Sequence, residues 1–93
     1  MSYEISYRGD NTGRRALNDL IGYIGLSRSK IIFRAMRSAT TFADLDAATI
    51  MASFCGVSGE PVRRLIARCH GESVLAAWSN APQGDPTQLA SVQ

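Results

Sequence analysis

The spacing of apolar residues changes after the first ten residues. From Tyr3 to Arg8 apolar and polar residues alternate, a period of two that is typical of a strand with one buried face. After the polar residues 10–13 the spacing becomes helical, with apolar residues at positions 17, 20, 21 and 24. Gly25 separates this segment from a second helical pattern at positions 31, 32, 35 and 36. The sequence therefore predicts a strand, a helix, a turn and a second helix over residues 3–37.

A unit of this kind cannot bury its apolar surface alone. A single strand has no partner, and two short helices cover too little area to form a stable core. We therefore expect a second copy of the chain to complete residues 1–39, with the two strands paired in an antiparallel ribbon. The outer face of such a ribbon fits the major groove of DNA.

Residues 4–37 resemble the ribbon–helix–helix family of DNA-binding proteins, the MetJ/Arc type. The resemblance is carried by the strand that ends at Arg8, by two leucines of the first helix, by the turn over 25–29, and by the apolar positions of the second helix: Leu17, Leu20, Gly25, Leu26, Ser27, Arg28, Ser29, Ile31, Ile32, Ala35 and Met36. It implies a dimer that binds double-stranded DNA.

Two groups of residues would then contact DNA. From the ribbon, Glu4, Ser6 and Arg8 would read base edges. At the start of the second helix, free backbone N–H groups and the positive end of the helix dipole suit a phosphate. The side chains expected to assist there are Ser27, which would also cap the helix, Arg28, Ser29 and Lys30.

The second half of the chain, residues 40–80, has a helical pattern throughout. Thr41 and Asp44 have the spacing of a capping box, and a helix to about Cys55 would bury Phe42, Leu45, Ala48, Ala52 and either Phe54 or Cys55. After a break at 56–58, Ser58 would cap a further helix with apolar residues at 62, 65, 66 and 69, which His70-Gly71 would end. A short last helix is expected over 72–79, and a flexible tail over 81–93.

Residues 48–68 also resemble the helix-turn-helix motif. Ala52 is the small residue before the turn, Gly56 is the turn glycine, and Val57, Val62 and Leu65 would pack the two helices together. In that interpretation a second DNA contact is made by Ser58, Gly59, Glu60, Arg63 and Arg64. The other interpretation is a helical pair that serves packing or extends a dimer.

The predicted fold class is mainly α with one short N-terminal strand: a ribbon–helix–helix unit over 1–39, a helical extension over 40–80, and the tail. Because Gly25 aligns with Gly56 and Ser27 with Ser58, the alternative is an all-α tandem of two helix-turn-helix hairpins. Ile21 stands where that motif requires a small residue, so the ribbon interpretation is preferred for the first half.

Composition narrows the class of protein. The 93 residues are 45% hydrophobic and 19% charged, which indicates a globular chain. No apolar run would span a bilayer and the N-terminus does not resemble a signal peptide, so we expect a protein of the prokaryotic cytosol or nucleoid that does not bind membranes. Residues 1–38 carry seven basic and three acidic side chains, whereas 39–93 carry three and five. The basic excess lies in the half expected to bind phosphate.

Residues for catalysis are not grouped in any recognisable pattern. The one histidine, His70, and the two cysteines, Cys55 and Cys69, lack metal-binding spacing, and glycine-rich phosphate loops and nucleophile elbows are missing from the sequence. We therefore expect no enzyme activity, no cofactor and no metal.

The leading functional hypothesis is a dimeric, sequence-specific DNA-binding transcriptional regulator, a repressor, of a size that suits phage or plasmid origin. One alternative is an antitoxin or other interaction module, with DNA bound by the N-terminal half and a protein partner by residues 40–80. Another is an accessory protein of plasmid or phage DNA transfer or partition.

Overall fold

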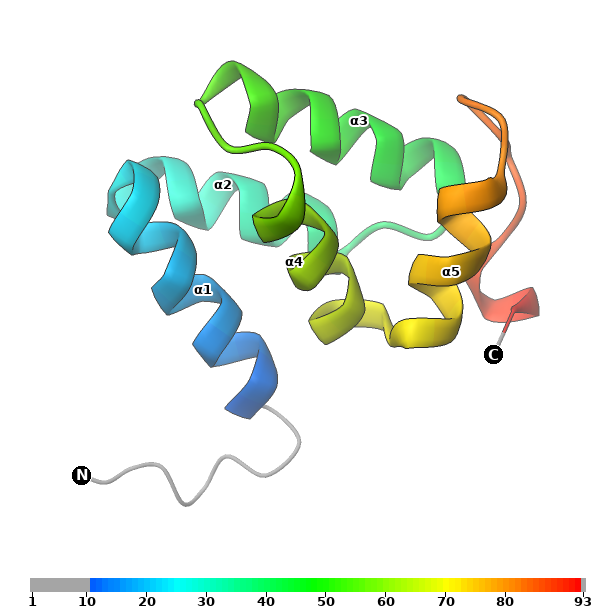
Figure 1. Cartoon of the computed structure of the whole chain (residues 1–93), viewed down its shortest axis with the longest axis horizontal. Coiled ribbons are helices and arrows are strands. Elements are labelled where there is room, and N and C mark those ends of the chain that lie inside the picture. Colours follow the sequence, from blue (N-terminus) through cyan, green and yellow to red (C-terminus); the bar gives the residue numbers. More distant parts are fainter. Residues whose placement is uncertain (1–10, 93) are drawn as a thin grey trace.

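The computed structural model describes residues 11–92, with side chains from Leu17 onward. This part of the chain is helical (Figure 1), with α1 at Asn11–Ile24, α2 at Leu26–Arg37, α3 at Phe42–Phe54, α4 at Glu60–His70, α5 at Glu72–Asn80 and a 3-10 helix, η2, at Leu89–Ser91. Helix α3 runs back antiparallel to α2, and α4 crosses the molecule between α1 and α5 (Figure 1). None of the helices between residues 11 and 92 combines the length and the apolar composition that crossing a membrane requires.

The ribbon–helix–helix fold class predicted from the sequence is wrong. Residues 11–92 form helices and contain no strand, with only an isolated antiparallel bridge between Thr41 and Gln88. The segment expected as a strand, Tyr3 to Arg8, lies outside the described residues. The all-α alternative is compatible with the structure.

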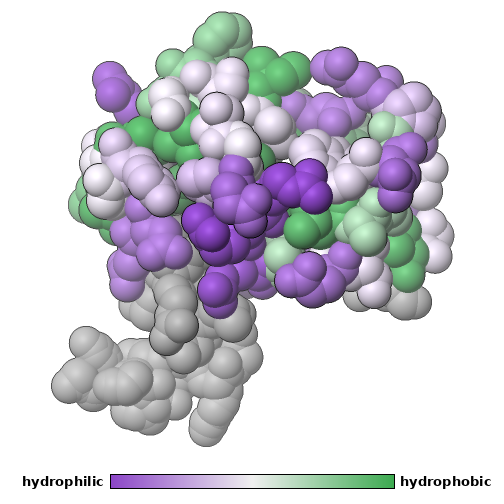
Figure 2. All heavy atoms as spheres, in the orientation of Figure 1, coloured by the Kyte–Doolittle hydropathy of each residue, from purple (hydrophilic) through white to green (hydrophobic). Residues whose placement is uncertain are grey.

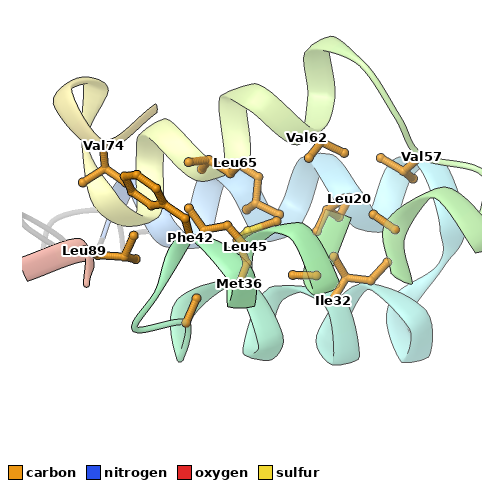
Figure 3. Close-up of a cluster of buried hydrophobic side chains, with 14 residues drawn as sticks. Leu20, Ile32, Met36, Phe42, Leu45, Val57, Val62, Leu65, Val74 and Leu89 are labelled. Carbon is orange, nitrogen blue, oxygen red and sulfur yellow. The ribbon is translucent and has the colours of Figure 1, made fainter. Parts of the chain in front are cut away.

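The prediction failed because the second half of the chain covers the first. Ile32 and Met36 of α2 have no exposed surface, and they lie in one cluster with Leu45 of α3 and Leu65 of α4 (Figure 3). The apolar face of the α1–α2 hairpin is therefore buried by helices of the same chain. A second copy is not needed to complete this core, and residues 1–39 and 40–80 do not have separate cores within the described range.

The starts of two helices also differ from expectation. Gly25, with φ +87°, is the N-cap of α2, so Ser27 lies inside the helix; likewise Gly59, with φ +73°, is the N-cap of α4 in place of Ser58. Neither cap provides a side-chain hydrogen bond. Glycine adopts positive φ without the steric cost that serine would carry, so backbone geometry decided these two positions.

The predicted capping box at the start of α3 is confirmed. Thr41 Oγ1 accepts from the Asp44 N–H at 3.1 Å, and Asp44 Oδ2 accepts from the Thr41 N–H at 3.1 Å. Asp44 Oδ2 also accepts from the N–H and the hydroxyl of Thr40, at 2.9 and 3.1 Å. Hydrogen bonds to the ionised carboxylate, above all from the Thr40 N–H, hold the pKa of Asp44 below its usual value of 3.8.

The segment after α5 is folded against α3, although a flexible tail was expected. Asp46 of α3 accepts hydrogen bonds from Trp78 Nε1 at 2.9 Å and from the Gly84 N–H at 2.6 Å. Leu89 is buried in the core, and its N–H donates to the Thr40 carbonyl at 2.9 Å. The proline- and glycine-rich composition of 82–86 correctly indicates the absence of a long helix there, but it does not predict these contacts.

A single core predicts one cooperative unfolding transition. Ile32→Ala in α2 and Ile66→Ala in α4, both at fully buried positions, should each lower the free energy of unfolding by about 2–5 kcal/mol. Ile31→Ala is the matched control, since the neighbouring Ile31 side chain is 59% exposed. Denaturant titrations followed by circular dichroism and by Trp78 fluorescence should give coincident midpoints for every variant. A Trp78 transition unaffected by Ile32→Ala would contradict the shared core.

The capping box predicts a pH-dependent contribution to stability. Folding lowers the pKa of Asp44, so its ionised carboxylate stabilises the fold at pH values above 3.8. This stabilisation is lost as the pH falls through the lower pKa of the folded state. Asp44→Ala should therefore lower the melting temperature at neutral pH, and the difference from wild type should shrink below pH 3.8. Thermal melts followed by circular dichroism over this range would check it. A difference that stays constant with pH would show that the carboxylate charge is not responsible.

Candidate nucleic-acid interface

The corner between α3 and α4 is built by the backbone of residues 52–59. Gly56, with φ +92°, ends α3; its N–H donates to the Ser53 carbonyl at 3.0 Å, and the Val57 N–H donates to the Ala52 carbonyl at 2.9 Å. This pair of bonds is the Schellman motif, which satisfies carbonyls that the helix end would otherwise leave unpaired. The chain is thereby turned sharply out of α3 and into α4.

The residues that were expected to hold the corner are in the core. Ala52 has no exposed surface, and Val57, Val62 and Leu65 are each exposed by no more than 3% (Figure 3). Alanine at position 52 leaves room for the neighbouring helices where a longer side chain would overfill the core. The position of α4 on α3 is therefore set by close packing at the corner.

The opposite face of α4 is open to solvent. All five residues predicted for the second DNA contact are exposed at the beginning of this helix: Ser58, Gly59, Glu60, Arg63 and Arg64. Figure 2 shows strongly hydrophilic side chains gathered at the centre of this face of the molecule, over α4. The structure thus brings the predicted residues together on one accessible helical surface.

Arg64 has an exposed acidic neighbour. Its Nη1 lies 4.0 Å from Glu60 Oε2, one helical turn earlier, in a pair whose two side chains are 46% and 70% exposed. An exposed pair of this kind contributes at most a small stabilisation, because water screens it and two long side chains are held in place. The arginine therefore remains available to an anion that binds it more strongly.

Arg68 is a candidate that the sequence analysis did not include. It lies one turn after Arg64, and the two arginines line a hollow between α1 and α4 together with Asp19, Tyr23 and Pro61. The spacing of four residues places both arginines on the same side of α4. Helical periodicity extended by one turn would have found this residue.

The residues predicted to contact phosphate from α2 are placed differently. Ser27, Arg28 and Lys30 are exposed, but Ser29 is fully buried and its hydroxyl donates to the Gly25 carbonyl. A hydroxyl in that position is turned into the protein. The expected base-reading residues of the strand, Glu4, Ser6 and Arg8, are outside the described residues.

The environments of His70 and Cys69 indicate structural roles for both residues. His70 Nε2 donates to the Met36 carbonyl at 2.7 Å and ties the end of α4 to α2. Burial raises the pKa of the Cys69 thiol to about 11, although Arg37 acts in the opposite direction. At neutral pH this thiol is protonated, which makes it a poor nucleophile and metal ligand. In the part of the chain that the structure describes, no three potential metal ligands are grouped.

Two features make the α3–α4 corner a candidate site for nucleic acid. The corner is fixed by buried apolar residues, and the exposed face that it presents carries Arg63 and Arg64 at the start of a helix. No family model, curated protein or solved structure matches this chain, so the interpretation of the corner rests on these two features.

Proposed function

We propose that this protein is a non-catalytic, sequence-specific DNA-binding regulator of the cytosol that acts as a dimer, with α4 as its recognition helix. The observation that carries the proposal is the joint exposure of residues 58–60, 63 and 64 on a helix whose other face is locked into the core. Helix-turn-helix proteins place the beginning of such a helix in the major groove, where its first turns meet the base edges.

The side chains on α4 supply the contacts that base recognition requires. Arg63 and Arg64 can each donate two hydrogen bonds to O6 and N7 of guanine, and Glu60 can accept from N4 of cytosine. Contact with a phosphate or a guanine would replace the weak pair between Arg64 and Glu60, which frees Glu60 for a base. The Ser58 hydroxyl can act as donor or acceptor.

The remaining positive charge supports binding without reading sequence. Arg68 lies with Arg64 on the α1 side of α4, and in this proposal it contacts the phosphate backbone that flanks the groove. Arg28, Lys30 and Arg34 of α2 are exposed and add to a net charge of +2 per chain, which a dimer doubles. Such charge accelerates association and gives a salt-dependent affinity for any duplex.

The second candidate function, a protein-interaction module over residues 40–80, is favoured by one observation. Ile50, Met51 and Phe54 of α3 are apolar and exposed, by 46%, 36% and 86%. An antitoxin of this kind would be expected to have a loosely folded second half without its partner. Here the second half shares its core with the first.

The α4 proposal predicts a loss of sequence preference on mutation. A preferred duplex, selected from a randomised pool by the wild-type protein, would be titrated by fluorescence anisotropy at several salt concentrations. Arg63→Ala or Arg64→Ala should reduce the preference for that duplex over random duplex by about 5–150-fold, the equivalent of one bidentate base contact. The matched control is Arg34→Ala on α2, which should weaken binding to both duplexes equally.

The outcomes separate the two candidate functions. If Arg34→Ala removes the preference while the α4 variants retain it, α4 is not the recognition helix. If the wild-type protein binds no duplex at low salt, the regulator proposal fails and the interaction module becomes the better explanation.

A further inference from the structure

Helix α3 carries apolar residues on two opposite faces. One face, with Phe42, Leu45, Ala48 and Ala52, is buried in the core. The other, at helical spacing, consists of Ala47, Ile50, Met51 and Phe54, and all four side chains are exposed. We call these four residues the outer stripe of α3. A surface helix normally has a single apolar stripe, the one that faces the core, so a second stripe on the opposite face is a candidate contact surface.

The outer stripe is concentrated in one place. Figure 2 shows apolar side chains along the edge of the molecule over the C-terminal half of α3, away from the hydrophilic centre over α4. Phe54 alone is 86% exposed. Isolated exposed apolar side chains are ordinary on protein surfaces, but a contiguous group at helical spacing marks an interaction site.

The charge distribution around the stripe suits a second copy of this chain. The sequence has no charged residue between Asp46 and Glu60, so two stripes can meet without opposing like charges. The flanks have opposite signs, because Asp44 lies at the start of α3 whereas Arg28 lies near the start of α2, the end of that helix beside the end of α3 in the antiparallel pair (Figure 1). Antiparallel pairing of two α3 helices about a two-fold axis therefore brings the acidic end of each copy toward the basic end of the other.

The same axis orients the DNA-binding face. In Figure 1, α3 lies along the upper edge and α4 faces the viewer. A two-fold axis along the viewing direction at that edge pairs α3 with its copy and leaves α4 of both copies on the same side. Two recognition helices on one side are what a dimer needs to bind two half-sites of one duplex.

We propose that the outer stripe of α3 is the homodimer interface, occupied by the antiparallel outer stripe of a second copy. The pairing geometry rests on the proposed DNA-binding role of α4, whereas the interface itself does not. The four side chains offer on the order of 400 Å² of apolar surface per copy, or roughly 800 Å² in total. This is below the roughly 1,200 Å² at which standard specific interfaces begin and is typical of weak, transient interfaces, so the dimer dissociates measurably on dilution.

The test is the mass of the protein in solution without DNA. Sedimentation velocity over a dilution series should show wild type changing from twice the 10.1 kDa of one chain to a single chain. Ala47→Glu places two carboxylates in the interface and should raise the dimer dissociation constant at least about tenfold. Ala76→Glu is the matched control, because Ala76 is also an exposed helical alanine but lies on α5, and it should leave the constant unchanged.

A mixing experiment tests whether the stripe pairs with itself. Ala47→Glu and Phe54→Lys should each be monomeric alone, and an equimolar mixture should recover a dimer, because antiparallel pairing places position 47 of one copy opposite position 54 of the other, where the unlike charges meet. Recovery supports the proposal. Wild type that remains monomeric at all concentrations overturns it, as does a dimer that Ala47→Glu leaves intact. Circular dichroism of each variant would verify that the monomers are folded.

Failure of this proposal is distinguishable from failure of the DNA-binding proposal. If Ala47→Glu is a monomer that still prefers the selected duplex, with weakened affinity and one half-site occupied, both proposals are supported. A wild-type dimer that depends on the outer stripe but binds no duplex supports the interface alone. A wild-type monomer that reads sequence through α4 supports DNA binding alone and overturns the interface.

Discussion

The fold depends on the contact between the α1–α2 hairpin and the two helices that follow it. Ile32 and Met36 of α2 are sealed from water because Leu45 of α3 and Leu65 and Ile66 of α4 close over them. A chain of 93 residues has little apolar surface to spare, and dividing it between two separate cores would leave each one marginal. Putting both halves into one core resolves that difficulty, and it fixes which face of every later helix remains outside.

For α4 this arrangement separates a buried supporting face from an exposed basic face. Val62, Leu65 and Ile66 hold one face of the helix in the core, and the hydrogen bond from His70 to Met36 ties down its far end. The face with Arg63 and Arg64 is thereby presented on a rigid element. Side chains that act from a rigid helix can be placed more accurately than those on a loop, which is what base recognition requires.

For α3 the same arrangement leaves a face without cover. One side of the helix is used by the core and the C-terminal segment is anchored beside it through Asp46, yet Phe54 and Ile50 remain in water. Exposing this much apolar surface to water is unfavourable, and burying it against another molecule would release that free energy. The packing of α3 therefore fixes both the core and the position of the outer stripe on the surface.

The sequence by itself determined the features that depend only on residues close together along the chain. The capping box of Thr41 and Asp44, the turn at Gly56, the buried positions of α3 and the exposed residues of α4 all follow from spacing and turn chemistry, which act over a few residues. Sequence reasoning also found that α2 has an apolar face.

The tertiary structure alone decided what covers each face. Periodicity identifies the apolar side of a helix but not its partner, so the sequence could not distinguish a second copy from α3 and α4 of the same chain. Ser29 turned inward, and Leu89 returned to the core from a segment of tail-like composition. Each of these depends on where distant parts of the chain come to lie, and long-range packing overrides the local preference of a residue wherever the two conflict.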